Sequence, residues 1–453
     1  MATKPKAIAI IGGGIAGATA AQTLSKYANL TIHLFDQGRR GVGGRTSSRS
    51  VASESDVDMK WDHGCQFFRA DTPQFQKILH GWVEKGFVKE WKGNFVSSAS
   101  LSTDREFFGL PSHPPFFVGS DGMQSIAQNV LKEVHHSMIN STTSSSLQFT
   151  GTRVSQMERD ETTKLWRLFG TTGDTAYHDT PEALVRRIED GMYQIGEDDG
   201  YDAVILTDVS SSFESWHRAS AGVPEDFAKR VRERVGARVP LFAAMIAFDK
   251  GSNIPFDAAS FDDSIIWFAA KSNSKPGTKG CYECWTLIST PEYAMKQIEE
   301  TPMQDPQTGE FIPQSSYYLT TVPGPDLVNA FNAQLCNESG VLGSEMLDKL
   351  PNIIHLDAQR WGSAMPCHRH LDVTSTTRKI IAIVPYDSAR HSLAPTKLER
   401  NGSSFLVDGD LMLLQAGDMM SSHTPGFEGA VLSGHDAAEC VYKMLQSSES
   451  KVV

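Results

Sequence analysis

The first elements of the chain follow from its apolar and polar positions. An apolar run over residues 8–11 predicts a strand that ends at a glycine-rich turn. Small residues over 16–21 then predict a helix that can pack closely on this strand. A second apolar run, 31–35, predicts another strand, which ends at Asp36. Strand, helix and strand in this order indicate an α/β fold with a parallel sheet.

Later segments alternate in a similar way. Helical spacing of apolar residues predicts helices over 72–85, about 123–136 and 224–234. Strand-like runs lie at 147–154, 165–169, 201–207, 241–248 and 265–270. Near the end, a strand over 411–414 leads into a Gly-Asp turn and a helix from 426 to about 445, followed by a disordered tail. Polar stretches at 171–200, 299–316 and 387–404 are predicted to be loops or insertions.

The two ends of the chain have the same order of predicted elements. Each has a strand, a glycine-containing turn and a helix, so the simplest arrangement joins both ends in one cofactor domain. The middle of the chain then forms a second domain. We predict a discontinuous cofactor domain from residues 1–65, 115–215 and 405–453, and a substrate domain from residues 66–114 and 216–404.

The first turn carries a dinucleotide-binding motif. Gly12, Gly14 and Gly17 fit G-x-G-x-x-G after a strand. These glycines allow a tight turn, a close approach of the backbone to a pyrophosphate, and close packing of the helix on the strand. Asp36 follows at about the spacing, roughly 20 residues, of an acid that binds a ribose. The motif predicts an adenine dinucleotide but does not separate NAD from FAD.

A second glycine-rich loop favours FAD over NAD as the ligand. Arginines and hydroxyl side chains are mixed with glycines over residues 39–49, a composition that suits phosphate binding. NAD dehydrogenases rarely need both this loop and a C-terminal Gly-Asp turn before a helix. A long cofactor that lies across the domain, such as FAD, needs both.

Composition and charge narrow the expected partners. The chain has 453 residues and a net charge of −12, so we expect no nucleic-acid partner. No apolar run reaches the ~18–20 residues of a membrane span. The first strand begins too early to leave room for a signal peptide, so we expect a cytoplasmic protein. We also expect no metal site, because Cys281 and Cys284 are interpreted as ordinary thiols and His135–His136 as a solvated helix end.

Several motifs together resemble the flavin amine oxidase and phytoene desaturase superfamily. They are the Gly12–Gly17 turn with Asp36, Gly43-Gly44-Arg45, Ala416-Gly417-Asp418 and Glu428-Gly429-Ala430. Residues 61–68, 273–276, 360–366 and 428–434 are similar to the renalase-like branch of that superfamily. The resemblance implies an α/β fold: a Rossmann-type, glutathione-reductase-like FAD-binding domain with an inserted α+β substrate domain built on a mixed or antiparallel sheet.

The resemblance also implies which residues hold FAD. The candidates are Gly12, Gly14, Ile15, Ala16, Gly17, Asp36, Gln37, Gly44, Arg45, Gln66, Phe67, Val154, Asp418, Glu428, Gly429 and Ala430. Asp36 is expected at the adenosine ribose, and the backbone of Val154 at the adenine. Gln66 and Phe67 are expected near the isoalloxazine, and the start of the last helix at the flavin O2 edge. No cysteine lies between residues 415 and 430, so the FAD is expected to be non-covalent.

Two functions stay open at this point. In the renalase-like reading, a dihydronicotinamide (an isomer of NAD(P)H) gives its hydride to flavin N5, and oxygen reoxidises the flavin to yield hydrogen peroxide. In the alternative, the enzyme oxidises an amine or another small metabolite, as a biosynthetic tailoring oxidase would. A flavin-binding protein without turnover, a pyridine-nucleotide dehydrogenase and a monooxygenase are further alternatives.

The catalytic candidates are His423, Lys271 and Trp267. His423 precedes the last helix and is the histidine to test as a proton acceptor, the alternative being a loop histidine bonded to backbone. Lys271 and Lys275 are candidates to contact a substrate anion or a water at flavin N5, the alternative being a solvated loop. Trp267, with aromatic residues such as Phe67, can line an apolar pocket for a neutral amine, the alternative being a place in the core.

Overall fold

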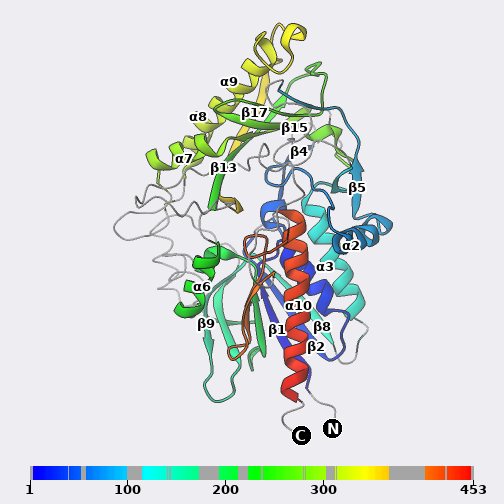
Figure 1. Cartoon of the computed structure of the whole chain (residues 1–453), viewed down its shortest axis with the longest axis vertical. Helices are drawn as coiled ribbons and strands as arrows, with labels where there is room; N and C mark the ends of the chain where they lie inside the picture. Colours follow the sequence, from blue (N-terminus) through cyan, green and yellow to red (C-terminus); the bar gives the residue numbers. More distant parts are fainter. Residues whose placement is uncertain are drawn as a thin grey trace, which may run out of the picture.

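A computed structural model describes residues 4–449 except for 39, 53–57, 99–114, 140, 142–143, 173–192, 213–222, 236–237, 279, 281, 303–311, 313, 367–403 and 424–425. The molecule has two halves, stacked along its longest axis (Figure 1). One half holds a parallel sheet with helices, and both ends of the chain lie at its far end. The other half holds a second sheet covered by helices.

The first sheet joins strands from three separated stretches of the chain. Its order is β18-β19-β12-β1-β2-β8, and all neighbours are parallel except β18 and β19. The strands are β1 (Lys6–Ile11), β2 (Leu30–Asp36), β8 (Ser145–Thr150), β12 (Ala203–Leu206), β18 (Leu406–Asp408) and β19 (Leu413–Gln415). This sheet confirms the predicted Rossmann-type α/β fold, in which the two ends of the chain lie together.

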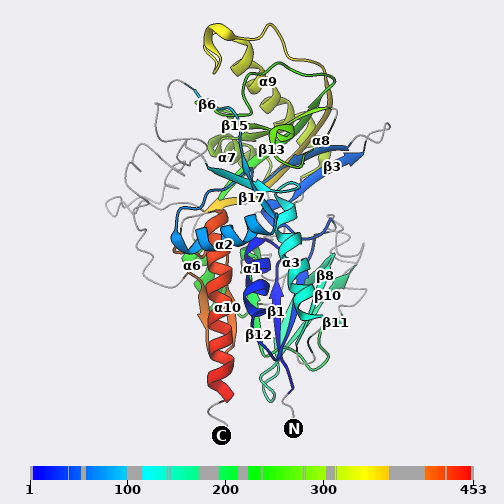
Figure 2. The ribbon, with the colours of Figure 1, turned by 90° about the vertical axis from the view of Figure 1, so that its right-hand side faces the viewer.

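Both faces of this sheet are covered, which explains why its strands are apolar on both sides. Helices α1 (Ile15–Leu24), α3 (Gln124–Met138) and α10 (Phe427–Glu449) lie on one face, and Figure 2 shows them side by side. The other face meets a three-stranded sheet of β9 (Thr152–Arg159), β10 (Trp166–Thr172) and β11 (Tyr193–Ile195), together with helix α6 (Glu225–Val235). Along β1, Ile8 and Ile10 join the core with the helices, whereas Ala7 and Ala9 join the opposite core.

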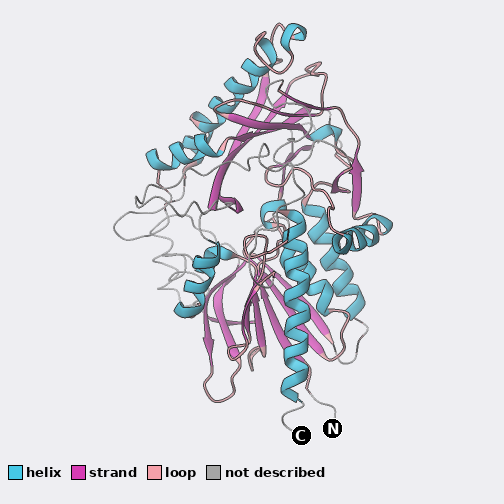
Figure 3. Ribbon diagram, in the orientation of Figure 1, coloured by secondary structure: helices cyan, strands magenta, loops and turns pink. Residues whose placement is uncertain are grey.

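The second half confirms the predicted mixed sheet. Its order is β17-β13-β16-β15-β14-β6, antiparallel throughout except for the pair β14 and β6. The strands are β6 (Phe95–Ser97), β13 (Arg238–Phe248), β14 (Ala258–Ser260), β15 (Ile266–Lys271), β16 (Glu283–Ser289) and β17 (Ile353–Pro366). Helices α7 (Pro291–Glu300), α8 (Ser316–Thr321) and α9 (Pro323–Cys336) cover one face of this sheet (Figure 3).

Short elements join the two halves. The hairpin of β3 (Ser48–Ala52) and β4 (Asp58–Asp62) packs on the second sheet through Met59 and Trp61, which share a core with Met245. Strand β5 (Val88–Trp91) pairs with β7 (Phe116–Gly119). Helix α2 (Pro73–Glu84) packs with α10. The buried apolar residues of α2 lie in the same hydrophobic core as those of α10. The segment 66–114, predicted to belong to the substrate domain, thus contributes β6 to the second sheet and α2 to the first half.

Two predicted boundaries were wrong. The strand predicted over 147–154 is two strands, because Gly151 has a φ of +62° and turns the chain between β8 and β9. The last helix runs to Glu449, so residues 446–449 are helical rather than disordered. The predicted insertions lie largely outside the described residues. Within the part of the chain that is described, no helix has the length and hydropathy to cross a bilayer.

Two buried histidines predict a loss of stability in acid. His33 on β2 contacts the hydroxyl of Tyr201 at 2.8 Å, and burial lowers the pKa of His33 to about 4. Burial and then the charge of Arg49 lower the pKa of His63 to about 4. Because unfolding restores a pKa near 6.5, the neutral forms stabilise the fold fully above about pH 6.5, and this contribution is lost as the pH falls toward 4.

We therefore expect His33→Gln to flatten the dependence of stability on pH. Urea unfolding of the parent chain at pH 7 and pH 5 is expected to differ by about 2 kcal/mol for each buried histidine. In His33→Gln, the difference in unfolding free energy between pH 7 and pH 5 is expected to be smaller by the contribution of His33. A substitution of exposed His80 is expected to leave this difference as it is in the parent chain. An identical pH dependence in His33→Gln and the parent would contradict this assignment.

Candidate functional site

The first turn of the cofactor half forms the centre of the candidate site. It follows β1 at the carboxyl end of the parallel sheet, where α/β folds bind ligands. Gly12 has a φ of +108°, and a Cβ at Gly17 would clash with the carbonyl of Gly12, so both positions require glycine. A Cβ at Gly14 would meet only Gly43, at 3.8 Å. The space in front of the turn is therefore open to a ligand.

Asp36 closes one side of this turn. Its Oδ2 accepts a hydrogen bond from the amide of Gly13 at 2.7 Å, and its Oδ1 accepts one from Gly38 at 2.7 Å. A carboxylate offers about four acceptor positions, so two remain for the hydroxyls of a ribose. Burial raises the pKa of Asp36, and the two backbone hydrogen bonds oppose this rise. Gln37, the next candidate, is exposed.

The second glycine-rich loop lies against the first. The amide of Gly43 donates to the carbonyl of Gly13 at 2.9 Å, and Gly14 and Gly43 form a parallel bridge. Gly44 begins a 3-10 turn over Gly44–Thr46 that directs Arg45 across the front of the site. Two glycine-rich loops that are separate in the sequence thus form one wall.

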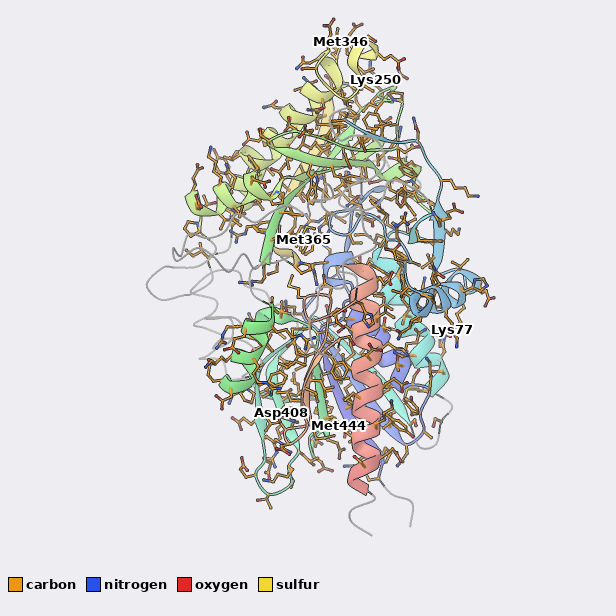
Figure 4. All side chains as sticks on the ribbon, in the orientation of Figure 1. Lys77, Lys250, Met346, Met365, Asp408 and Met444 are labelled. Carbon is orange, nitrogen blue, oxygen red and sulfur yellow. The ribbon has the colours of Figure 1, made fainter. Side chains whose placement is uncertain are left out.

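The C-terminal segment completes the cradle. Arg45 Nη1 donates to Asp418 Oδ2 at 2.8 Å, and Nη2 contacts the other carboxylate oxygen, which makes a bidentate ion pair. Arg45 Nη1 also donates to the carbonyl of Ala364 at 3.1 Å, at the end of β17. The neighbouring Met365 lies between the two halves of the molecule in Figure 4. Arg45 therefore links the second glycine-rich loop, the last turn and the second sheet.

Helix α10 begins beside this turn. Gly426 has a φ of +90°, and its carbonyl accepts the amide of Ala430 at 3.0 Å. The Ala430 amide is thus used inside the helix. Gly429 and the other first-turn amides are left for the predicted donor role, which stays a prediction. Glu428 does not face the cradle with its carboxylate, which accepts hydrogen bonds from the amides of Asp71 (2.8 Å) and Thr72 (3.1 Å) at the start of α2.

Comparisons with known proteins agree with this geometry. Residues 10–82 match the family model described as an NAD(P)-binding Rossmann-like domain. The chain has a dinucleotide-binding fold. A redesigned putrescine oxidase is similar in structure, with a TM-score of 0.51 and 11% identity over 98% of this chain and 100% of that chain. An oxidoreductase from Methanosarcina mazei gives a TM-score of 0.51 and 10% identity over 96% and 100% of the two chains. At these identities the likeness shows a shared fold and no more.

The residues of the cradle fit FAD. The open front of Gly14, the two spare acceptor positions of Asp36 and the first-turn amides of α10 suit a pyrophosphate, a ribose and an anionic ring edge respectively. Ile15 and Ala16 start α1 and are buried, so only their backbone is available to a ligand. Val154 lies on β9, an edge strand of its sheet in the described structure, and the contact of its backbone with the adenine stays a prediction.

A buried ion pair stands beside the cradle. Lys275 Nζ donates to Asp62 Oδ2 at 3.0 Å and to Gln66 Oε1 at 3.1 Å, and it lies 5.3 Å from the ring centre of Trp91. The side chain of Lys275 is 1% exposed and that of Asp62 is 4% exposed. Asp62 Oδ1 also accepts from Ser48 Oγ at 2.6 Å. A salt bridge that is buried away from water in this way is stable only when nearly all of its polar atoms form hydrogen bonds.

Gln66 and Phe67 both contact other residues of the chain. The amide nitrogen of Gln66 donates to the carbonyls of Asp62 and Gly64, so both ends of this side chain are used by the protein. Phe67 is buried among aromatic rings, with its ring centre 4.7 Å from Phe116. Their expected contact with the isoalloxazine stays a prediction, and Phe67 also has the core role that was the alternative.

Lys271 is paired with a carboxylate of the neighbouring strand, and its catalytic role stays a prediction. Its Nζ lies 3.0 Å from Glu283 Oε2, and Glu283 also accepts from Ser252 and from Trp285 Nε1. Although burial alone would raise the pKa of Glu283, these hydrogen bonds lower it below its ordinary value. Trp267 is half-buried against the main core. Of the two lysines considered, the buried Lys275 is the one near the cradle, and the sequence did not distinguish it from Lys271.

His423 is bonded to a carboxylate rather than to backbone. Its Nε2 lies 3.0 Å from Asp436 Oδ2, on α10. His435 Nδ1 lies 3.1 Å from Asp436 Oδ1, and Ser404 donates to Oδ2 at 2.5 Å. Burial acts to raise the pKa of Asp436, but these hydrogen bonds hold it well below its ordinary value. This cluster fixes the segment before α10. With Nε2 on Asp436, Nδ1 is the nitrogen that a proton acceptor at His423 would use, and that role stays a prediction.

Proposed function

We propose that the protein is an FAD-dependent oxidase of a small molecule, with non-covalent FAD in the cradle. The observation that carries the proposal is the Arg45–Asp418 ion pair, which joins the two glycine-rich loops to the last turn. A ligand that contacts both glycine-rich loops and the last turn would lie across the cofactor half, as an extended dinucleotide such as FAD can. When bound, FAD accepts a hydride at N5 and passes the electrons to an acceptor, for which we propose oxygen.

In this proposal, the residues of the chain bind FAD and the substrate and orient them. Asp36 holds the adenosine ribose, and the amides around Gly14 meet the pyrophosphate. The amides at the start of α10 stabilise negative charge at the pyrimidine edge of the flavin. Lys275 donates to Asp62 and Gln66 and so holds the segment that follows β4 in place beside the cradle.

We propose a dihydronicotinamide as the substrate, as in the renalase-like branch. A dihydropyridine that loses a hydride becomes an aromatic pyridinium, so the protein needs no general base. The second candidate is an amine or another small metabolite. The fold shared with putrescine oxidase and the aromatic cluster around Phe67 favour that alternative. We propose a cytoplasmic location for either enzyme.

The cofactor assignment has a direct test. We expect the purified chain to be yellow, and acid precipitation to release FAD into the supernatant, because no covalent bond holds it. Absorbance and mass spectrometry of the two fractions give the result. Flavin that stays with the pellet contradicts non-covalent binding, and colourless protein that does not take up added FAD contradicts the cofactor.

The substrate test uses the FAD-loaded protein without oxygen. We expect isomeric dihydronicotinamides to bleach the flavin absorbance within a rapid-mixing experiment, and amines such as putrescine to leave it unchanged. Bleaching by an amine alone would reject the dihydronicotinamide and favour the alternative. Addition of oxygen after bleaching, with detection of hydrogen peroxide, tests the acceptor.

A further inference from the structure

Polar atoms without a partner gather between the β3–β4 hairpin and strand β17. Arg49 Nε, His63 Nδ1 and His355 Nε2 are all buried, and none of them has a hydrogen bond within the described structure. Buried polar groups are nearly always paired, so a group of unpaired ones needs an explanation. These three atoms come from separate segments, and the proposed cofactor site uses none of them.

Strand β17 brings polar side chains to face the hairpin. Residues 355, 357, 359 and 361 alternate along the strand and therefore share one face. Arg49 forms an ion pair with Asp357 through Nη1, and its Nη2 lies 3.4 Å from Gln359 Oε1. The guanidinium thus has both Nη atoms directed to β17, and Nε is its nitrogen that has no hydrogen-bond partner in the described structure.

Aromatic stacking fixes both imidazoles. The ring of His63 stacks on Trp361 with centres 5.3 Å apart, and Trp361 Nε1 donates to the carbonyl of His63 at 2.7 Å. The ring of His355 stacks on Trp61 with centres 4.9 Å apart. His63 is only 6% exposed. Because stacked rings keep their orientation, their unpaired nitrogens are held ready for a ligand.

The charge around these nitrogens is positive. Arg40 is exposed, and its charge and that of Arg49 act to lower the pKa of His63, which places both guanidinium groups nearby. Asp357 is paired with Arg49, and Asp62 is paired with Lys275. Asp357 therefore offsets one of the two arginine charges, and the positive charge that remains favours an anion.

We propose that Arg49, His63 and His355 form a phosphate-binding subsite that holds the phosphate group of the substrate. A carboxylate prefers the fork of two parallel guanidinium donors, which Asp357 and Gln359 already occupy. A tetrahedral phosphate can instead take single hydrogen bonds from separate donors: Arg49 Nε–H and the two neutral imidazoles, each of which can donate in one tautomer.

The subsite borders the cofactor cradle. Gly64 follows His63, and a Cβ at Gly64 would meet both the carbonyl of Arg45 and, at 3.3 Å, the ring of Trp361. Arg45 in turn pairs with Asp418 in the cradle. The identity of the ligand as substrate rests on the proposed function, whereas phosphate binding itself does not. In that proposal, the substrate class narrows to dihydronicotinamide nucleotides rather than ribosides.

Binding of inorganic phosphate tests the subsite. We expect isothermal titration of the FAD-saturated protein to show one phosphate site that is at least tenfold weaker in two variants. Arg49→Lys retains the charge beside Asp357 but lacks Nε–H, and His63→Phe retains the stacked ring but lacks Nδ1. Arg230→Lys, on the surface, is the matched control and is expected to bind phosphate as the parent does. Equal phosphate affinity in the parent and both variants, or no binding by the parent, would overturn the subsite.

A pair of substrates separates this inference from the proposed function. In anaerobic flavin reduction, we expect dihydronicotinamide mononucleotide to have a half-saturating concentration at least tenfold lower than dihydronicotinamide riboside, and Arg49→Lys to remove the difference. Equal half-saturation of the two in the parent overturns the assignment of the subsite to the substrate. If neither compound bleaches the flavin while phosphate binding follows the variants as expected, the proposed function fails and the phosphate subsite stands.

Discussion

Lys275→Met is expected to lower the free energy of unfolding by about 3–5 kcal/mol. The variant removes the cation that pairs with the buried carboxylate of Asp62, and a charge left without its partner in the interior is costly. It also leaves Gln66 Oε1 without its donor. Methionine has a similar length, so the cavity contribution is small. Urea unfolding followed by circular dichroism measures the change.

Two further variants show whether the ion pair is the cause. Lys60→Met removes an ammonium from the same hairpin, but its partner Asp121 is 70% exposed, so the expected loss is within about 1 kcal/mol. The double variant Asp62→Asn with Lys275→Met carries no lone charge and is expected to recover part of the loss. A Lys275→Met variant no less stable than Lys60→Met would show that Asp62 does not need this partner.

Asp36→Ala is expected to weaken FAD binding about 100-fold. The substitution removes two acceptors for the ribose and frees the amides of Gly13 and Gly38 that shape the turn. Hydrogen bonds to a charged group contribute roughly 1.5–3 kcal/mol each, and about 2.7 kcal/mol corresponds to 100-fold. Fluorescence titration of the FAD-free protein with FAD measures the dissociation constant.

The control for Asp36 is a second carboxylate nearby. The charge of Asp208 helps to raise the pKa of Asp36, so Asp208→Ala makes the same change in net charge near the same turn. We expect Asp208→Ala to change FAD affinity less than tenfold. A comparable loss in both variants would mean that charge, rather than the hydrogen bonds of Asp36, decides the affinity. Circular dichroism of the FAD-free variants shows whether each one folds.

Much of the cofactor half could be predicted from local spacing. The positions of Gly12, Gly17 and Asp36 reflect the length of one strand, one helix and the next strand, and these lengths are set by backbone geometry. The same reasoning located the last turn at Asp418 and the helix after it. The division into domains stays a prediction, and α2 shows its difficulty, because a helix between two domains can pack on either one.

The side-chain partners could not be predicted from spacing. Lys271 and Lys275 lie four residues apart, yet Lys271 meets Glu283 on the neighbouring strand whereas Lys275 meets Asp62. The 3-10 turn over Ser272–Ser274 reverses the chain between them and directs Lys275 inward. The sequence singled out His423 correctly as a histidine beside the last helix, but nothing local identified Asp436 as its partner.

One signal in the sequence was available for the phosphate subsite. Residues 355, 357, 359 and 361 alternate His, Asp, Gln and Trp, a pattern typical of a strand with one polar face. Without the partner element, such a face is indistinguishable from one exposed to solvent. Only the packing of the β3–β4 hairpin on β17 buries it and brings Arg49 and His63 to it.

The sequence by itself determined the dinucleotide-binding turn, the α/β class and the return of the chain end to the start. These depend on short stretches whose glycines and apolar periods act through local backbone geometry and burial. The tertiary structure alone decided which charged groups are paired, which are buried, and which nitrogens stay unpaired. The physical reason is that a charge or hydrogen bond depends on the distance in space between groups, and the pairs Arg45–Asp418, Lys275–Asp62 and Arg49–Asp357 each join residues more than 200 positions apart.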